Sequence, residues 1–314
     1  MYASDALTSV RRGLNLEAWR SWPIEPRKRL EKPRRKVIVK LPRSLFCLIL
    51  LSCVAQFATA QVSFSTVYNL TLNDPHDGNN QAIAQGRDGN LYITGPIGGD
   101  SGGGSCIGGC GGVLSLTPAG LESVIYQMGT NIADGSTPQG GVTLGSDGEL
   151  YGTTSSSFVA GSGAYGTIYK LSTGGTFTLL YSFGTGAARS PVAPPIQAND
   201  GNYYGTTVES GTSGEIYRIT STGVFTTLFT FTASETMGGE DMVLGTDGNL
   251  YGASGVFNCG SVWKTTTNGV FTELHNFAPT QSTDGCTPYG LVQAGDGNFY
   301  GDRKSTRLNS SHRH

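Results

Sequence analysis

The sequence predicts an all-β protein, a β-propeller built of four-stranded antiparallel blades. Three observations support this prediction: an Asp-Gly-x-x-Tyr motif occurs five times, β-prone segments follow each copy in a fixed order, and no segment has the periodicity of an amphipathic helix. The 47 glycines among 314 residues show no three-residue period, which excludes collagen, and the 10% aromatic content excludes wholesale disorder.

The Asp-Gly motif marks the turn between the first two strands of each unit. Successive motif aspartates are 59, 53, 47 and 49 residues apart, which is the length of a propeller blade. Asp-Gly supplies the positive φ of a tight type I′ hairpin, and Asp accepts local backbone hydrogen bonds. The predicted turn residues are Asp88, Gly89, Asp147, Gly148, Asp200, Gly201, Asp247, Gly248, Asp296 and Gly297.

The other strands of the unit follow in order. A short β-prone run such as 168–171 forms the third strand, a glycine turn such as 173–175 follows it, and an alternating run such as 177–183 forms the fourth. The apolar stretch before each Asp-Gly supplies the first strand. Four strands in 45–55 residues suit a propeller blade, whereas a β-helix would need a shorter repeat.

The propeller is predicted to be incomplete in this chain. Residues 64–70 align with the fourth-strand run, so the chain is expected to start on a strand that can close the ring against the last blade. One leading strand, four blades and half of a fifth follow from this count. We expect an intact ring of six or more blades.

Both ends of the chain are expected to lie outside the propeller. Residues 1–60 hold twelve Lys and Arg against four acids, and the apolar run 45–51 leads to Ala58-Thr59-Ala60. This pattern indicates a basic extension and a secretory signal peptide cleaved after Ala60, with a nucleic-acid-binding arm as the alternative. Residues 302–314 resemble a translated sequencing adapter and are expected to be non-native. The predicted propeller therefore occupies residues 61–301.

The net charge of −2 averages over these dissimilar parts. Residues 61–301 carry five basic residues against eighteen acidic ones, a net charge of −13. Such an acidic domain is not expected to bind nucleic acid or anionic membranes.

One edge of the blades is predicted to carry the ligand-binding residues. Both hairpin turns of a blade fall on one edge, and the longer, variable connections fall on the other, as expected of a binding face; loops that simply tolerate drift are the alternative. Acidic loops can bind Ca²⁺, but no EF-hand spacing occurs and solvated surface acids are the favoured interpretation. The candidate residues are His76, Asp77, Asp100, Asp134, Arg189, Glu209 and Asp284.

Two rows of third-strand residues recur from blade to blade. A row of bases can form a ring for an anionic ligand or pair with neighbouring acids, and pairing is favoured. A row of aromatic residues can stack on sugars or pack between blades, and packing is favoured. The bases are Lys170, Arg218 and Lys264, and the aromatic residues are Tyr169, Tyr217 and Trp263.

Four cysteines are predicted to form two disulfides. Cys259 and Cys286 fall on the same edge of one blade, and Cys106 and Cys110 lie in one loop. An exported protein permits such bonds. No His stands near either pair, so a metal site is the weaker interpretation.

The repeats resemble the bacterial GloVer tandem repeats of secreted "choice-of-anchor" proteins. The resemblance rests on Asp-Gly-Asn-Leu-Tyr-Gly at 247–252, Gly-Thr-Ile-Tyr-Lys-Leu at 166–171 and Phe-Thr-Thr-Leu-Phe-Thr-Phe at 225–231, and it covers nearly all of 62–301. Ile93-Thr94 and Ser115 depart from the pattern. The resemblance implies extracellular display through a C-terminal anchor and no established activity.

Two functions remain open on the sequence. The favoured one is a secreted or cell-surface protein that binds a glycan or a protein, or serves structurally, without catalysis and without a cofactor other than Ca²⁺. The alternative is a secreted enzyme acting on polysaccharide or a lactone. Such an enzyme usually needs a cluster of His, Arg or metal ligands, for which the chain offers His76, His275, Arg87, Arg189 and Arg218.

Overall fold

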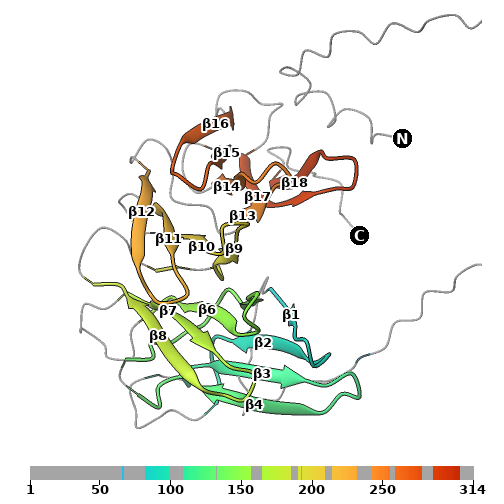
Figure 1. Ribbon diagram of the computed structural model, residues 1–314, viewed down its shortest axis with the longest axis vertical. Helices are drawn as coiled ribbons and strands as arrows, with labels where there is room; N and C mark the ends of the chain where they lie inside the picture. The colour runs from blue at the N-terminus through green and yellow to red at the C-terminus, as the bar shows by residue number, and fades with distance from the viewer. Residues whose placement is uncertain are drawn as a thin grey trace, which may run out of the picture. The chain divides into compact units, whose positions relative to one another are not determined.

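The computed structural model describes most of the predicted blades (Figure 1). It covers residues 82–99, 109–131, 133–156, 165–184, 193–208, 214–231, 242–254, 259–277 and 286–304, with residues 66, 106, 190 and 191. Of residues 286, 287, 289 and 302–304 it describes the backbone. The predicted leading strand, 64–70, and the predicted signal peptide lie outside the described residues.

The described residues form eighteen strands and no helix. The first blade contains β1 (Ala84–Gln85), β2 (Leu91–Gly95), β3 (Gly112–Leu116) and β4 (Glu122–Gln127). The second contains β5 (Val142–Leu144), β6 (Leu150–Thr154), β7 (Thr167–Leu171) and β8 (Phe177–Ser182). The third contains β9 (Ile196–Gln197), β10 (Tyr203–Thr206), β11 (Glu215–Ile219) and β12 (Phe225–Thr230). The fourth contains β13 (Met242–Leu244), β14 (Leu250–Ser254), β15 (Ser261–Thr265) and β16 (Phe271–Asn276), and the fifth contains β17 (Cys286–Gln293) and β18 (Phe299–Lys304).

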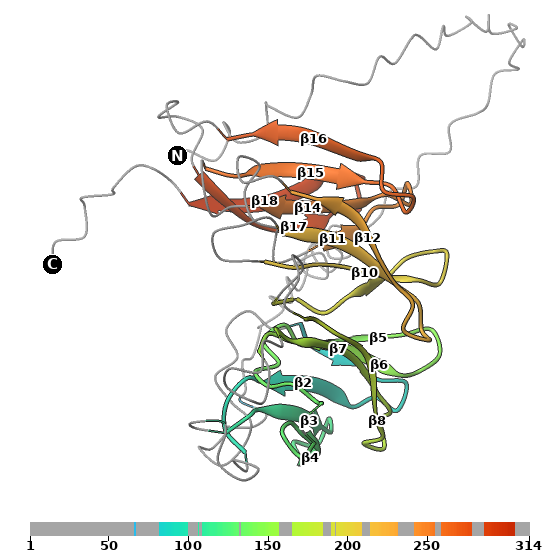
Figure 2. The same cartoon turned by 90° about the vertical axis from the view of Figure 1, so that its left-hand side faces the viewer.

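Each blade is an antiparallel meander, so the protein is a β-propeller of four-stranded blades, as predicted. The first four sheets each order their strands as they occur in the chain, and β17 and β18 form a two-stranded sheet (Figures 1 and 2). Strand pairing among the named strands stays within each sheet, and the described sheets do not form a closed ring (Figure 1). β18 continues three residues past Gly301, to Lys304.

The hairpin turns differ from the predicted type I′ form. In the first turn the amide of Gly89 donates to the carbonyl of Gly86 (3.1 Å), and the amide of Gly86 donates to the carbonyl of Asn90 (2.8 Å). Gly89 has φ +83°, whereas Asp88 is not among the described residues with positive φ. This is a type I turn followed by a left-handed glycine, which satisfies the strand twist with one positive φ instead of two. The turns between third and fourth strands repeat it, for example with Gly120 bonded to Thr117 (2.9 Å).

The inner sheets pack against a neighbouring blade on both faces, as the second blade shows. Leu150, Tyr169 and Leu171 of the second blade cluster with Tyr92 and Val113 of the first. Alternate residues of the same strands, such as Tyr151 and Ile168, cluster instead with the third blade. Because side chains alternate across a strand, every residue of β6 faces one interface or the other, and all five are buried.

The outermost strands are linked by stacked aromatic rings. Tyr126 stacks on Phe177 with ring centroids 4.6 Å apart. The equivalent pair Tyr181 and Phe225 lies at 4.1 Å, and the pair Phe229 and Phe271 lies at 3.9 Å. His275 occupies the same position on the fourth blade, where it is exposed and lies edge-on to Phe277.

The glycine after each motif tyrosine makes room for a third-strand aromatic residue. Gly152 pairs with Tyr169, and a Cβ on Gly152 would overlap the Tyr169 hydroxyl. Gly205 with Tyr217 and Gly252 with Trp263 repeat this arrangement. The three aromatic side chains are fully buried, so packing between blades is confirmed. In the first blade, the cross-strand pair of Ile93 and Leu114 fills the same space.

We predict that replacing Gly152 and Tyr169 together lowers the free energy of unfolding by less than the sum of the two single replacements. Gly152→Ile should cost about 1–3 kcal/mol of unfolding free energy because it overpacks the interface, and Tyr169→Leu should cost less because it leaves a partly collapsible cavity. The double variant recreates the Ile93 and Leu114 pair, so its loss should be smaller than the sum. Chemical denaturation followed by circular dichroism measures this, and a strictly additive double variant would contradict it.

Candidate functional site

The blades present two edges of opposite character. Nine connections, between first and second or between third and fourth strands, each have five residues; we call this the turn edge. The connections on the opposite edge, the loop edge, vary. Those between second and third strands have 16, 12, 8 and 6 residues, and those from one blade to the next have 14, 13, 11 and 9.

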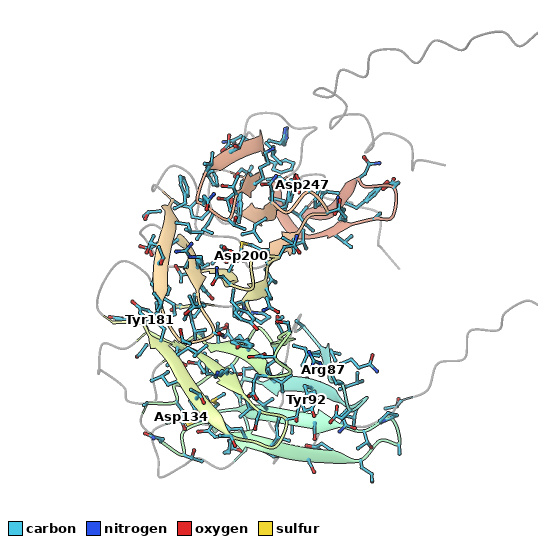
Figure 3. All side chains as sticks on the ribbon, viewed as in Figure 1. Arg87, Tyr92, Asp134, Tyr181, Asp200 and Asp247 are labelled. Carbon is cyan, nitrogen blue, oxygen red and sulfur yellow. A yellow bond between two sulfur atoms is a disulfide. The ribbon has the colours of Figure 1, made fainter. Side chains whose placement is uncertain are left out.

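On the turn edge, the motif aspartate holds its own turn. Asp200 Oδ1 accepts the amide of Asn202 (3.1 Å), and Asp200 Oδ2 accepts the Asn202 side-chain amide (2.9 Å) and the Tyr204 hydroxyl (2.6 Å). The bond from tyrosine to aspartate recurs in all five turns at 2.6–2.8 Å. Glu149 replaces Asn in the second turn and keeps the backbone bond to Asp147. Asp200 and Asp247 mark two of these turns in Figure 3.

In several of these turns the contacts shift the pKa of the aspartate and of the tyrosine. The hydrogen bond from Tyr92 is the largest influence that holds the pKa of Asp88 below its ordinary value of 3.8. For Asp200 and Asp247, burial raises the pKa, but hydrogen bonds from Tyr and Asn outweigh it, so their pKa is lowered. In the fifth turn, the backbone amide of Asn298 leads the lowering of the Asp296 pKa. Burial, followed by the bond to Asp200, raises the pKa of Tyr204 to about 12.

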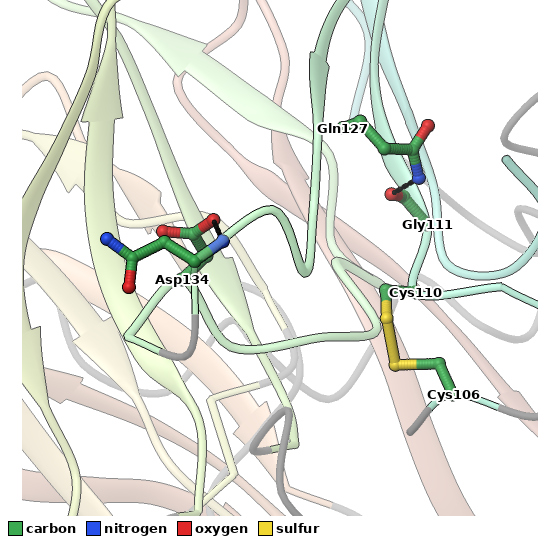
Figure 4. Close-up of a disulfide and its surroundings, with 6 residues drawn as sticks. Cys106, Cys110, Gly111, Gln127 and Asp134 are labelled. Atoms are coloured by element: carbon green, nitrogen blue, oxygen red, sulfur yellow. Dashed lines mark hydrogen bonds between the residues drawn. A yellow bond between two sulfur atoms is a disulfide. The ribbon is translucent and has the colours of Figure 1, made fainter. Parts of the chain in front are cut away.

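On the loop edge, Asp134 is the one predicted ligand-binding residue that the structure describes. It is 2% exposed, and its Oδ2 accepts the Tyr126 hydroxyl (2.6 Å), the Thr130 hydroxyl (3.1 Å) and the Asn131 amide (2.9 Å). Figures 3 and 4 show it within the connection from the first to the second blade. Asp134 therefore stabilises the segment from Tyr126 to Asp134, where this connection leaves the first blade.

Hydroxyl groups fasten the same connection to the second blade. The Thr167 hydroxyl donates to the Asp134 carbonyl (3.1 Å) and lies 2.8 Å from the Thr154 hydroxyl. Thr137 accepts the amide of Ser155 (3.1 Å) and donates its own amide to the carbonyl of Cys110 (3.0 Å).

The next connection has an equivalent anchor at Ser190. Its carbonyl accepts the amide of Val208 (3.2 Å), and its amide donates to the carbonyl of Tyr165 (2.8 Å). Thr137 and Ser190 both precede proline and both have positive φ, 61° and 48°. Such backbone is costly for a residue with a Cβ, so the surrounding hydrogen bonds hold the loop ends in a fixed form.

The other predicted ligand-binding residues, His76, Asp77, Asp100, Arg189, Glu209 and Asp284, lie outside the described residues. Within the described ranges, no three His, Cys, Asp or Glu side chains come together as a metal site would require. A search of the same ranges finds no helix that is long and apolar enough to cross a membrane.

The predicted disulfide between Cys106 and Cys110 is confirmed (Figure 4). It lies in the long connection between β2 and β3, where Cys110 is fully buried. The side chain of Gln127 donates to the carbonyl of the adjacent Gly111 (2.7 Å). Cys259 is also disulfide-bonded, and the side chain of its predicted partner, Cys286, lies outside the described residues.

The predicted pairing of the third-strand bases with acids is wrong for two of them. The Lys170 ammonium donates to the carbonyl of Ser221 in the next blade (3.4 Å), and the Arg218 guanidinium donates to the Thr226 hydroxyl (3.5 Å). Each of these bases lies cross-strand from a motif tyrosine. The hydroxyl of that tyrosine donates a hydrogen bond to the motif aspartate.

Two contacts of the turn edge were not predicted from the sequence. The tyrosine four residues after each aspartate recurs at a regular spacing, which is the signal of the hydroxyl–carboxylate bond. The glycine after it varies together with the third-strand aromatic residue, since Ile93 replaces it in the described blade that has Leu114.

We predict that Tyr204→Phe raises the pKa of Asp200 towards 3.8. The aspartate pKa is lower in the folded chain, so its contribution to stability is complete above the ordinary pKa and is lost as pH falls through the lowered folded value. Removing the donor should narrow the acid range over which the chain stays folded. Carboxyl NMR titration measures the pKa, with Tyr181→Phe as control because the Tyr181 hydroxyl does not contact a motif aspartate. An unchanged Asp200 pKa in Tyr204→Phe would contradict the assignment.

We predict that Cys106, Cys110 and Cys259 resist alkylation unless the protein is reduced first. Closing so short a loop at Cys106 and Cys110 is worth roughly 2 kcal/mol by the chain-entropy argument, so Cys106→Ser should lower stability by about that amount. Peptide mass spectrometry with and without reductant reads the labels. Label on any of the three cysteines in the unreduced, folded protein would count against the assignment.

Comparison with known proteins places the chain in a repeat family. The sequence model described as the Gloeobacter/Verrucomicrobia repeat matches residues 52–253 and 159–310. No curated protein matches the chain. Solved structures with similar folds include the periplasmic gluconolactonase of Pseudomonas aeruginosa (17% identity, 74% of this chain and 68% of that one, TM-score 0.46) and a nidogen/laminin complex (14%, 70% of each, 0.45). TolB from Acinetobacter baumannii is also similar (16%, 72% and 50%, 0.42). The chain belongs to the Gloeobacter/Verrucomicrobia repeat family.

Proposed function

We propose that this protein is a secreted, cell-surface repeat protein whose loop edge binds an extracellular glycan or protein without catalysis. The contrast between the two edges carries the proposal. Nine connections on the turn edge have five residues each, whereas those between second and third strands range from 6 to 16. A scaffold that fixes one edge and varies the other is suited to presenting different loops on a common frame.

The loop ends support the same interpretation. Thr137 and Ser190 hold equivalent backbone hydrogen bonds although the connections that contain them differ in length. Variation is therefore tolerated beyond fixed anchor points, as in binding loops on rigid scaffolds. The disulfide of Cys106 and Cys110 braces the longest of these connections, 96–111, and is compatible with an oxidising compartment.

The charge of the domain narrows the class of partner. With −13 over residues 61–301, the domain repels nucleic acid and anionic membrane surfaces. Neutral glycans and proteins without a strongly acidic surface fit this charge. The predicted loop residues His76, Glu209 and Asp284 supply hydrogen-bonding groups suited to both.

We predict that binding depends on the loop edge and not on the turn edge. The protein is applied to a glycan array and to immobilised cell-surface proteins, and bound ligands are titrated against Glu209→Gln and His76→Ala. Each variant should weaken binding about tenfold, because Glu209→Gln replaces a charged acceptor by a neutral one and His76→Ala removes a hydrogen-bonding side chain. The matched control is Glu149→Gln, which removes an acid from the turn edge and should leave affinity unchanged.

Two results would overturn this function. Equal weakening by Glu149→Gln would show that the loop edge is not the binding surface. Turnover of a polysaccharide or of a lactone, abolished by the loop variants, would establish the enzymatic alternative instead.

A further inference from the structure

The five Asp-Gly turns are of two alternating kinds. In the first, third and fifth blades a glutamine ends the first strand, followed two residues later by a residue other than Ser or Thr. In the second and fourth blades a leucine ends the strand, and Ser or Thr precedes the Asp-Gly. The glutamines are Gln85, Gln197 and Gln293, the leucines are Leu144 and Leu244, and the hydroxyl residues are Ser146 and Thr246.

A glutamine of the first kind binds the hydroxyl residue of the blade before it. Gln197 Oε1 accepts the amide of Ser146 (2.8 Å), and Gln197 Nε2 donates to the Ser146 hydroxyl (3.0 Å) and to its own turn at Gly201 (3.1 Å). Gln293 repeats all three bonds with Thr246 and Gly297, at 2.8, 3.2 and 3.0 Å. One glutamine side chain thus forms hydrogen bonds with both the backbone amide and the hydroxyl of a residue in the preceding turn.

Aromatic stacking separates the same two kinds of junction. Where a glutamine reaches back, the motif tyrosine stacks on an aromatic residue of the next blade: Tyr151 on Tyr203 (3.8 Å) and Tyr251 on Phe299 (4.0 Å). At the other junctions the equivalent residues of the next blade are Leu150 and Leu250, which pack within the interblade clusters.

At those other junctions a side chain reaches forward instead. Arg87 Nη2 donates to the carbonyl of Ser146 in the second blade. Asn199 of the third blade lies beside Gly248 in the turn of the fourth. The two glutamine junctions therefore share the same hydrogen bonds, and at the two other junctions Arg87 or Asn199 approaches the motif glycine of the next turn, Gly148 or Gly248.

We infer that the blades of this propeller alternate between two kinds. The glutamine of one kind selects a preceding blade of the other kind, in which Ser or Thr stands directly before the Asp-Gly turn. Gln85 occupies the equivalent position at the end of the first strand of the first blade. It is exposed, its side chain makes no hydrogen bond with a residue that the structure describes, and nearby Ile83 is 59% exposed. This edge of the first blade fits a repeat blade of the Leu-Gly-Ser/Thr-Asp-Gly kind, as found at 144–148 and 244–248, and not one of its own kind.

Amide hydrogen exchange of the full chain tests the selection at single sites. Gln197→Ala should speed exchange of the Ser146 amide about tenfold, because that amide loses its acceptor, and should leave the Thr246 amide unchanged. Gln293→Ala should do the reverse. The matched control is Gln85→Ala, which should alter neither amide, and circular dichroism confirms that each variant is folded.

Variants of the turn test which partner the glutamine accepts. Ser146→Thr should keep slow exchange of the residue 146 amide, whereas Ser146→Ala should speed it about threefold through loss of the hydroxyl contact. In Gln197→Ala the Ser146→Ala change should have no further effect. The inference is overturned if Gln85→Ala acts like Gln197→Ala, if Gln197→Ala leaves the Ser146 amide protected, or if Ser146→Ala is equally effective with and without Gln197.

Discussion

The hydrogen bond from the motif tyrosine to the motif aspartate ties each turn to the surface on which the next blade packs. The carboxylate fixes the turn through the residue two positions later, and the hydroxyl holds the ring of the tyrosine four positions later. That ring enters the interblade cluster, as Tyr92 and Tyr151 do. A charge-assisted bond is stronger than a neutral one, so a half-exposed turn can position a buried ring.

Packing between successive blades explains how much the blades share and where they differ. Two pairings fill the same volume between blades: glycine beside Tyr169 or Trp263, and isoleucine beside Leu114. Protein interiors are close-packed, so even one additional carbon atom must be accommodated by the neighbouring side chain. The hydroxyls of Tyr169 and Tyr217 have no hydrogen-bond partner in the described structure, which indicates that these rings are retained for their shape. The interfaces between blades thus constrain the volume of the paired side chains more than their hydrogen bonding.

The same constraint separates scaffold from variable surface. On the turn edge, the motif aspartate binds its own turn in each Asp-Gly hairpin, and Gln197 links its turn to that of the preceding blade. On the loop edge, residues such as Thr137 and Ser190 anchor the described ends of the connections. The connections therefore vary in length on the edge that the fold constrains least.

The sequence by itself determined the blade, its four strands and the role of Asp-Gly as a turn, because these depend on local periodicity and on φ. It also placed Cys106 and Cys110 together, four residues apart. Only the tertiary structure decided the turn type, the burial of Asp134, the carbonyl and hydroxyl partners of Lys170 and Arg218, and the alternation of blade junctions. Each of these depends on a contact between residues distant in sequence or on a backbone conformation that two similar turns can share. Gln85, Gln197 and Gln293 look alike in sequence, and the neighbouring blade determines which of them forms a bond.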